Sequence, residues 1–363
     1  MSRAISLARV ALGSTSPNPA VGAVIVKDGR IVGEGYTLPP GQRHAEIGAL
    51  EQAGGDANGA VLYCTLEPCC HYGRTPPCTD AVIAAGIARV FYGATDPNPR
   101  VSGGGAAALH AAGISAGYVR TPETVELYEG FAKHVVTGQP FVVAKFAMSL
   151  DGKIATHAGD SKWITGEPAR LRVQEMRKEL DAIVVGIGTV LADDPQLTAR
   201  DAEGRPLAAH LQPVRVVVDS AARTPVGARM LQEPGRTIVT VGGNAPPGRV
   251  GDLRAAGAEV CLFPGDDRRV DLAGMLTHLG GLGLVNVLVE GGGTILGSML
   301  DVGLIDKVHV FIGAMLIGGM DARSPIEGRG AGSMRDVWDL RETRLEQIGP
   351  DWLITGYPHR GSE

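Results

Sequence analysis

One histidine, one glutamate and two cysteines in the first quarter of the chain have the types and spacing of a catalytic zinc site. His44 and Glu46 open an expected helix, and Cys69 and Cys78, each preceded by proline, follow. Catalytic zinc typically has three protein ligands and one position open to water, and imidazole and thiolate ligands favour zinc over magnesium or calcium. Zinc lowers the pKa of its bound water toward neutrality. Glu46 lies two residues from His44, where it can move protons without being a ligand.

The spacing of the two cysteines differs from the common deaminase pattern. Zinc-dependent base deaminases carry H-x-E followed by P-C-x-x-C, whereas eight residues separate Cys69 from Cys78 here. Proline before Cys78, at the start of an expected helix, can still return the second thiolate to the site. From the residues alone, Cys70 and His71 are alternative ligands. A structural zinc site, or two reduced cysteines in a turn, is the alternative to catalysis.

Glycine-rich segments in the second part of the chain could bind phosphate. Gly186 and Gly188 follow an apolar run, but Leu191 stands where a dinucleotide fingerprint needs its third glycine. Gly291, Gly292 and Gly293 follow an apolar strand and precede an expected helix, whose free N–H groups and dipole favour a phosphate group. A packing turn is the alternative interpretation of both segments.

Two arginines are candidates for binding a substrate phosphate. The planar guanidinium groups of Arg177 and Arg200 could each form two parallel hydrogen bonds with it. Taken singly, each is equally consistent with a solvated surface residue.

Alternating strand and helix patterns along both parts of the chain predict an α/β fold. In the first part we expect strands at 21–26, 31–35, 61–65 and 88–92, and helices at 44–53, 77–85 and 125–136. Gly138 and Pro140 mark the predicted boundary between domains 1–138 and 139–363. In the second part we expect strands at 141–147, 182–186, 214–218, 236–241, 258–262, 285–290 and 307–312, helices at 167–179, 270–279 and 293–302, and a loop over 202–213.

Composition limits the class of protein. Hydrophobic residues make up 44% of the 363 positions, which excludes disorder as the main state, and a net charge of −5 argues against a nucleic-acid-binding protein. We find no candidate membrane span or signal peptide, so a cytoplasmic protein without a membrane partner is expected. The odd count of five cysteines argues against a disulfide framework. Cys64 and Cys261 are expected to be core residues.

The first part of the chain resembles the bifunctional deaminase/reductase family of riboflavin biosynthesis. The resemblance rests on residues 16–22 (SPNPAVG), the H-A-E motif at 44–46 and the run 65–78, whose long cysteine spacing is normal in that family. Residues 70–72 read Cys-His-Tyr where the family commonly has Ser-His-His. The resemblance implies zinc ligands His44, Cys69 and Cys78, Glu46 as the proton shuttle, and Asn18 near the bound pyrimidine.

The resemblance extends over about residues 6–351 and implies a fold for each domain. The N-terminal domain would be a cytidine-deaminase-like layered α/β/α domain, and the C-terminal domain a dihydrofolate-reductase-like α/β domain. Lys145 and Asp193 are candidates for polar catalysis at the sugar. The residues implied to line the NADPH site are Ala147, Trp163, Thr189, Asp193, Ser220, Gly292, Gly293, Thr294, Ile295, Leu296, Gly297 and Ser298. Those implied to touch the substrate are Ser161, Arg177, Leu197, Arg200 and Glu290.

The implied function is two consecutive steps on a small phosphorylated pyrimidine. Zinc-dependent hydrolytic deamination of 2,5-diamino-6-(5-phosphoribosylamino)pyrimidin-4(3H)-one would precede NADPH-dependent reduction of the ribosyl group to ribityl, in a homo-oligomer formed through the reductase domain. One alternative is a zinc deaminase of another base or nucleoside with a non-catalytic C-terminal binding or oligomerisation domain, against which Arg177, Arg200, Asp193 and Glu290 argue. A non-enzymatic zinc-stapled binding protein is the other, against which Glu46 and an open zinc position argue.

Overall fold

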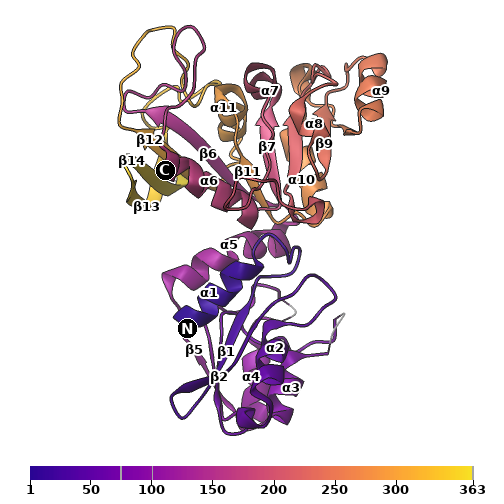
Figure 1. Ribbon diagram of the computed structural model, residues 1–363, viewed down its shortest axis with the longest axis vertical. Coiled ribbons are helices and arrows are strands. Elements are labelled where there is room, and N and C mark those ends of the chain that lie inside the picture. The colour runs from indigo at the N-terminus through magenta and orange to yellow at the C-terminus, as the bar shows by residue number, and fades with distance from the viewer. Residues whose placement is uncertain (74–75, 100, 362–363) are drawn as a thin grey trace. The chain divides into compact units, whose positions relative to one another are not determined.

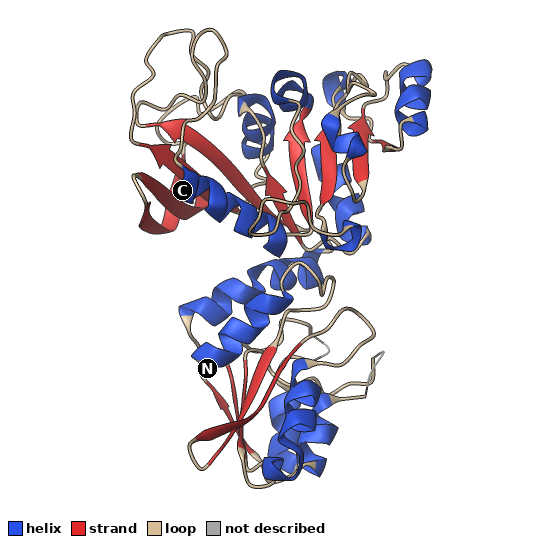
Figure 2. Cartoon of the chain, in the orientation of Figure 1, coloured by secondary structure: helices blue, strands red, loops and turns tan. Residues whose placement is uncertain are grey.

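The computed structural model describes residues 1–73, 76–99 and 101–361, so Arg74 and Thr75 of the cysteine-containing run lie outside the described residues. The chain divides into two compact units (Figure 1). The first unit comprises Met1–Pro140 with Gly280–Val285, and the second comprises Phe141–Leu279 with Asn286–Glu363. Each unit is built on one β-sheet with packed helices, which confirms the predicted α/β class (Figure 2).

The first unit is a three-layer α/β/α domain around a five-stranded sheet of order β2-β1-β3-β4-β5. Helices α1 and α5 lie on one side of the sheet and α2, α3 and α4 on the other (Figure 1). β1 runs antiparallel to β2 and β3, and β3, β4 and β5 run parallel. The elements are α1 (Ser2–Ala11), β1 (Gly22–Lys27), β2 (Arg30–Tyr36), α2 (Ala45–Ala53), η1 (Gly54–Ala57), β3 (Val61–Cys64), α3 (Cys78–Ala84), β4 (Arg89–Tyr92), α4 (Gly104–Ala111), β5 (Ser115–Tyr118) and α5 (Pro122–Thr137).

Glycines on β2 allow α2 to pack directly against that strand. A Cβ atom on Gly33 would come within 2.1 Å of the Ala49 carbonyl oxygen, and one on Gly35 within 2.1 Å of the Ala45 oxygen. Any larger residue would push the helix off the sheet, because such contacts lie far inside van der Waals distance. The close approach fixes the N-terminal end of α2, from which His44 and Glu46 project.

The second unit contains a nine-stranded sheet of order β10-β9-β8-β7-β11-β6-β12-β14-β13. The strands from β10 to β12 are parallel, and β14 and β13 add an antiparallel pair. The elements are β6 (Phe141–Ser149), α6 (Glu167–Glu179), β7 (Ala182–Gly186), α7 (Ile187–Asp193), η2 (Ala209–Leu211), β8 (Val214–Val218), α8 (Arg229–Gln232), β9 (Thr237–Val241), α9 (Pro247–Ala255), β10 (Glu259–Leu262), η3 (Asp266–Arg268), α10 (Leu272–Gly281), β11 (Asn286–Val289), α11 (Gly293–Asp301), β12 (Lys307–Gly313), β13 (Trp338–Ile348) and β14 (Asp351–Arg360).

The strand order creates a switch point in the middle of this sheet. From β6 the chain moves outward through β7, β8, β9 and β10, and then returns to place β11 between β7 and β6. Ligands of open α/β sheets bind beyond the carboxyl ends of strands at such points. The sequence predicted β7, β8 and α6 with their observed bounds, whereas α7, α8, α9 and the hairpin of β13 and β14 were not predicted, and the expected loop 202–213 contains the short helix η2.

Candidate active sites

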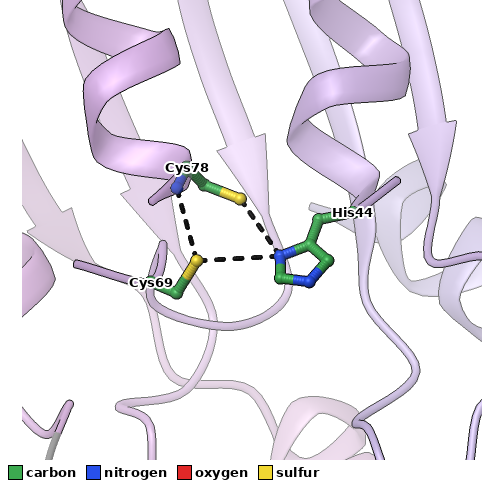
Figure 3. Close-up of side chains that lie close together, drawn as sticks. All are labelled: His44, Cys69 and Cys78. Atoms are coloured by element: carbon green, nitrogen blue, oxygen red, sulfur yellow. Dashed lines mark hydrogen bonds between the residues drawn. The ribbon is translucent and has the colours of Figure 1, made fainter. Parts of the chain in front are cut away.

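The three predicted zinc ligands of the first unit lie together (Figure 3). The Nδ1 atom of His44 is 3.3 Å from Sγ of Cys78 and 3.6 Å from Sγ of Cys69. Tetrahedral coordination with Zn–S of about 2.3 Å and Zn–N of about 2.0 Å separates sulfur from nitrogen by roughly 3.5 Å. The donor atoms therefore fit a single zinc ion.

Each ligand is positioned by a defined element. His44 is the N-cap residue of α2, and Cys78 is the first residue of α3. Cys69 follows β3, and its sulfur accepts a hydrogen bond of 3.3 Å from the backbone N–H of Cys78. Two helix N-terminal ends thus converge on the sulfurs, where their dipoles favour thiolate.

The surroundings of this site shift the pKa values of the two thiols in opposite directions. Hydrogen bonds from the Cys78 thiol and from His44 lower the pKa of Cys69 to about 4, although burial opposes the shift. The hydrogen bond to Cys69, together with burial, raises the pKa of Cys78. Cys69 is therefore available to a cation as a thiolate. The proton of the Cys78 thiol would be released when a metal ion binds.

Glu46 is buried in the first turn of α2 and interacts with the Cys78 thiol. Burial raises the pKa of its carboxyl group to about 7, and the charge of Cys69 adds to this shift. A carboxyl group whose pKa is close to neutrality can both accept and release a proton.

The remaining cysteines lie elsewhere. A Cβ atom on Gly104 would come 2.8 Å from Sγ of Cys70, so this sulfur lies against the start of α4. Neither Cys70 nor His71 belongs to the donor group among the residues the structure describes. Cys64 is buried, as expected. The expectation that Cys261 is a core residue is wrong, because it is half-buried on β10, the edge strand of the second sheet.

Glu67 holds the segment that carries Cys69, a role the sequence analysis did not single out. Its buried carboxylate accepts backbone N–H bonds of 3.0 Å from Gly103 and 2.9 Å from Ala106. These bonds tie the zinc-site loop to the start of α4. A third, longer bond of 3.4 Å comes from Asp96.

A cavity of about 430 Å³ opens beside His44 and is lined by His44, Arg43 and Asp80 among others, but not by Cys69 or Cys78. The structure places Asn18 in the turn before β1, where it is half-buried and its backbone N–H donates to the Thr15 oxygen. Asn18 is not among the residues that line this cavity.

The second unit contains a cavity of about 1480 Å³ at the carboxyl ends of β7, β8 and β11. Nine of the residues expected to bind cofactor or substrate line it: Ser161, Thr189, Asp193, Ser220, Gly292, Gly293, Thr294, Ile295 and Ser298. Ala147, Trp163, Leu296 and Gly297 do not line it. Leu296 is fully buried, and Trp163 is exposed beneath the guanidinium of Arg170, 4.6 Å from its ring centroid.

Two helix starts form the wall of this cavity. β7 leads into α7 and β11 into α11, and the Gly292 N–H donates to Oγ1 of Thr189 at 3.1 Å. A Cβ atom on Gly297 would come 1.9 Å from the Glu327 oxygen, so the segment around Glu327 packs tightly onto α11. This backbone contact by itself requires glycine at position 297.

Arg177 and Glu290, both expected to touch the substrate, form a bidentate ion pair with each other at 2.7 and 2.8 Å. Burial would raise the pKa of Glu290, but Arg177, helped by Lys145, outweighs it and lowers that pKa. Burial lowers the pKa of Lys145, whose Nζ lies 5.6 Å from the ring centroid of Phe311. These three charged residues do not line the cavity.

The last two expected substrate residues also lie outside the cavity lining. Leu197 is buried, and Arg200 donates to the Gly204 oxygen and to Gln196.

Arginines that the sequence analysis did not single out line the same cavity: Arg223, Arg269, Arg323, Arg329 and Arg360. They come from loops after β8 and β10, from the segment after β12 and from the end of β14. Arg223 lies three residues after Ser220, which is the one local signal that could have identified it.

Comparisons with known proteins cover both units. The family described as the cytidine and deoxycytidylate deaminase zinc-binding region matches residues 1–94, and the RibD C-terminal domain family matches residues 140–354. The riboflavin biosynthesis protein RibD of Actinobacillus pleuropneumoniae is 43% identical over 359 residues, which cover 98% of this chain and 93% of that protein. The chain belongs to the RibD family. The RibD protein of Escherichia coli is 41% identical, with 97% and 96% of the two chains covered.

Solved structures of the RibD family share the whole architecture. The RibD structure of Acinetobacter baumannii is 37% identical with a TM-score of 0.85, over 99% of this chain and 97% of that one. A Thermotoga maritima structure, described as a diaminohydroxyphosphoribosylaminopyrimidine deaminase/5-amino-6-(5-phosphoribosylamino)uracil reductase, is 38% identical with a TM-score of 0.83 and the same coverage. The protein is therefore an enzyme of riboflavin biosynthesis with a zinc-binding deaminase domain and a reductase domain, as predicted. Within the described ranges, no helix has the length and apolar character needed to cross a bilayer.

Proposed function

We propose that the first unit binds one zinc ion through His44, Cys69 and Cys78 and deaminates the diaminopyrimidine ribotide on which the Thermotoga maritima relative is described as acting. The observation that carries this proposal is the convergence of one imidazole and two sulfurs at distances of 3.3 and 3.6 Å, with a buried carboxyl group beside them. Bound zinc would supply Lewis-acid activation of water.

Glu46 is proposed to move the protons of the first reaction. It would move one proton of the attacking water to the ring nitrogen and the other to the amino group as the carbon–nitrogen bond breaks, so that ammonia leaves and a carbonyl remains. Its buried position supports this role, because the carboxyl group is shielded from bulk water. The adjoining cavity beside His44 would hold the pyrimidine ring.

We propose that the large cavity of the second unit binds NADPH and the deaminated ribotide together. Its volume of about 1480 Å³ exceeds the range of roughly 300–1,000 Å³ common for a single small ligand. The start of α11 lines the cavity beside Glu327, which accepts a hydrogen bond from Oγ1 of Thr294, and the arginines that line the cavity offer positive charge for phosphate groups. NADPH would supply the hydride that reduces the ribosyl group to ribityl.

Lys145 and Asp193 are proposed to act at the sugar, with Lys145 providing the proton that accompanies the hydride. Asp193 lines the cavity, and Lys145 is coupled electrostatically to Glu290, two residues before Gly292 of the cavity wall. Asn18, Arg177, Leu197 and Arg200 remain proposed substrate residues on the family resemblance.

We further propose that the enzyme acts in the cytoplasm and forms homo-oligomers through the second unit. Free thiols support a reducing compartment. The edge strand β13, which is eleven residues long and mostly exposed, supports pairing with another copy, because long open edges are usually covered.

The deciding experiment is incubation of the zinc-loaded enzyme with the diaminopyrimidine ribotide, with and without NADPH, followed by mass spectrometry. We expect the deaminated ribotide without NADPH and the ribityl product with NADPH. Failure to deaminate this ribotide, together with release of ammonia from another base or nucleoside, would overturn the substrate assignment.

A further inference from the structure

A second set of metal-ligating atoms lies at the edge of the sheet in the second unit. Glu259 and Cys261 are two residues apart on β10, so both side chains lie on the same face of that strand. His278, in the last turn of α10, lies against this face. One donor atom from each of the three residues lies within 4.8 Å of the other two.

The distances are close to those of coordination. Sγ of Cys261 is 3.9 Å from Nε2 of His278 and 3.9 Å from Oε1 of Glu259. Zinc bond lengths of about 2.0–2.3 Å place tetrahedral ligands roughly 3.5 Å apart. The two distances from Cys261 need a contraction of a few tenths of an ångström, and the Glu259–His278 separation, which is at most 4.8 Å, needs a contraction of no more than roughly 1.5 Å. The three side chains are half-buried or exposed, so they have room to adjust.

The surroundings orient the histidine, although two arginines, Arg236 and Arg254, also act on Cys261. The ring of Phe263 lies 5.4 Å from the ring of His278 at a tilt of 57°, which restricts the imidazole. The C-terminal end of a helix attracts positive charge, and His278 occupies the last turn of α10. Arg236 opposes the cation, but it binds Oε2 of Glu259 at 2.8 Å and leaves Oε1 facing Cys261.

We propose that Glu259, Cys261 and His278 form a second binding site for a divalent ion of the zinc class, separate from the deaminase site and from the large cavity. Thiolate and imidazole ligands select zinc and cobalt over magnesium and calcium. The three residues belong to neither site described above. A bound ion would link the edge strand β10 to the end of α10, and solvent would complete its coordination.

Metal content of the full-length enzyme tests this proposal. After equilibrium dialysis against buffered micromolar free zinc, we expect two zinc ions per chain in the wild type and one in Cys261→Ser and in His278→Gln. Cys70→Ser is the matched control and should keep both, since its sulfur belongs to neither donor group. Deamination should be unchanged in the Cys261 and His278 variants.

Cobalt gives an independent readout of the sulfur ligand. Cobalt added to enzyme that carries one equivalent of zinc, in the deaminase site, should produce thiolate-to-cobalt absorption in the wild type and none in Cys261→Ser. Zinc should also raise the melting temperature of the second unit in the wild type more than in either variant. A single zinc ion per wild-type chain, or a second ion that persists in both variants, would overturn the proposal.

Discussion

The Nδ1 atom of His44 lies 3.3 Å from Sγ of Cys78, although 34 positions separate the two residues in the sequence. Each residue stands at the N-terminal end of a helix, and both helices pack on the same face of the first sheet (Figure 1). Folding of the unit therefore brings the donor atoms together. A preformed ligand set of this kind binds its metal without a large ordering cost, because the side chains are already in place.

Replacement of Glu46 should separate proton transfer from metal binding. Glu46→Gln keeps the size of the side chain but removes its ability to accept a proton, so we expect deamination to fall by about 10²–10⁴-fold. Zinc content should remain unchanged because the three ligands are intact. Ammonia release and elemental analysis measure the two properties.

Asp56→Asn is the matched control for this change. Asp56 lies in η1, directly after the same helix, and its carboxylate is exposed and paired with Lys27 at 3.9 Å. Its replacement should leave deamination within the error of the wild-type value. Loss of zinc from Glu46→Gln would show that the carboxylate supports the metal and would contradict its assignment as a shuttle.

Removal of metal should affect only one of the two reactions. A chelator is expected to abolish ammonia release, since water would lose its activating ion. Reduction of the deaminated ribotide should persist, because the large cavity is formed by residues of the second unit. NADPH oxidation with chemically prepared intermediate measures the second activity, and its loss together with deamination would indicate a shared site.

The proximity of His44, Cys69 and Cys78 was predicted because these residues lie in short motifs with distinctive residue types and because the family resemblance implied this set. The sequence did not predict that Glu290 and Arg177 bind each other, since 113 positions separate them and no local pattern links a carboxylate to one of many arginines. The sequence did not predict that arginines line the large cavity either, because these residues come from separate loops.

The missed hairpin has a different cause. β13 is exposed along nearly its whole length, and beyond Arg341 its residues show no alternation of apolar and polar side chains. Edge strands exposed on both faces lack the period that sequence reasoning uses. Strands buried on both sides, such as β7 and β8, gave apolar runs, interrupted in β8 only by Arg215, and were predicted with their observed bounds.

Gly292 should tolerate alanine structurally but not functionally. A Cβ atom there would meet only Oγ1 of Thr189, at an ordinary 3.6 Å, and both residues line the cavity. We expect Gly292→Ala to fold normally and to raise the KM for NADPH by about tenfold, which a steric cost of about 1.4 kcal/mol would produce. Gly248→Ala, at an open position on α9, is the control and should leave KM unchanged.

Lys145 should contribute to the reductase activity and not to the stability of the second unit. Burial lowers the pKa of its ammonium group, which means that the folded protein holds this charge at a cost. Lys145→Met should therefore keep or raise the urea midpoint of the second unit while reduction falls by about 10²-fold. The exposed Lys178→Met serves as the control. A large loss of stability would instead assign Lys145 a structural role.

The ion pair of Arg177 and Glu290 should make the stability of the second unit depend on pH. Glu290→Gln leaves a buried guanidinium unpaired and should cost about 3–5 kcal/mol of unfolding free energy at pH 7. All three tryptophans, Trp163, Trp338 and Trp352, belong to the second unit, so tryptophan fluorescence in urea reports its unfolding alone.

The sign of the pH effect follows from the lowered pKa of Glu290. The stabilisation is fully present at pH values above the pKa of Glu290 in the unfolded chain, about 4.3. It is lost as the pH falls through the lower pKa of Glu290 in the folded protein. The difference between wild type and Glu290→Gln should therefore shrink in acid. Glu175→Gln, which removes a more exposed carboxylate from the same helix as Arg177, should show no such trend.

An Arg177→Met, Glu290→Gln double variant should recover part of the lost stability, since no unpaired charge remains. A pH-independent difference would show that the pair is not the cause.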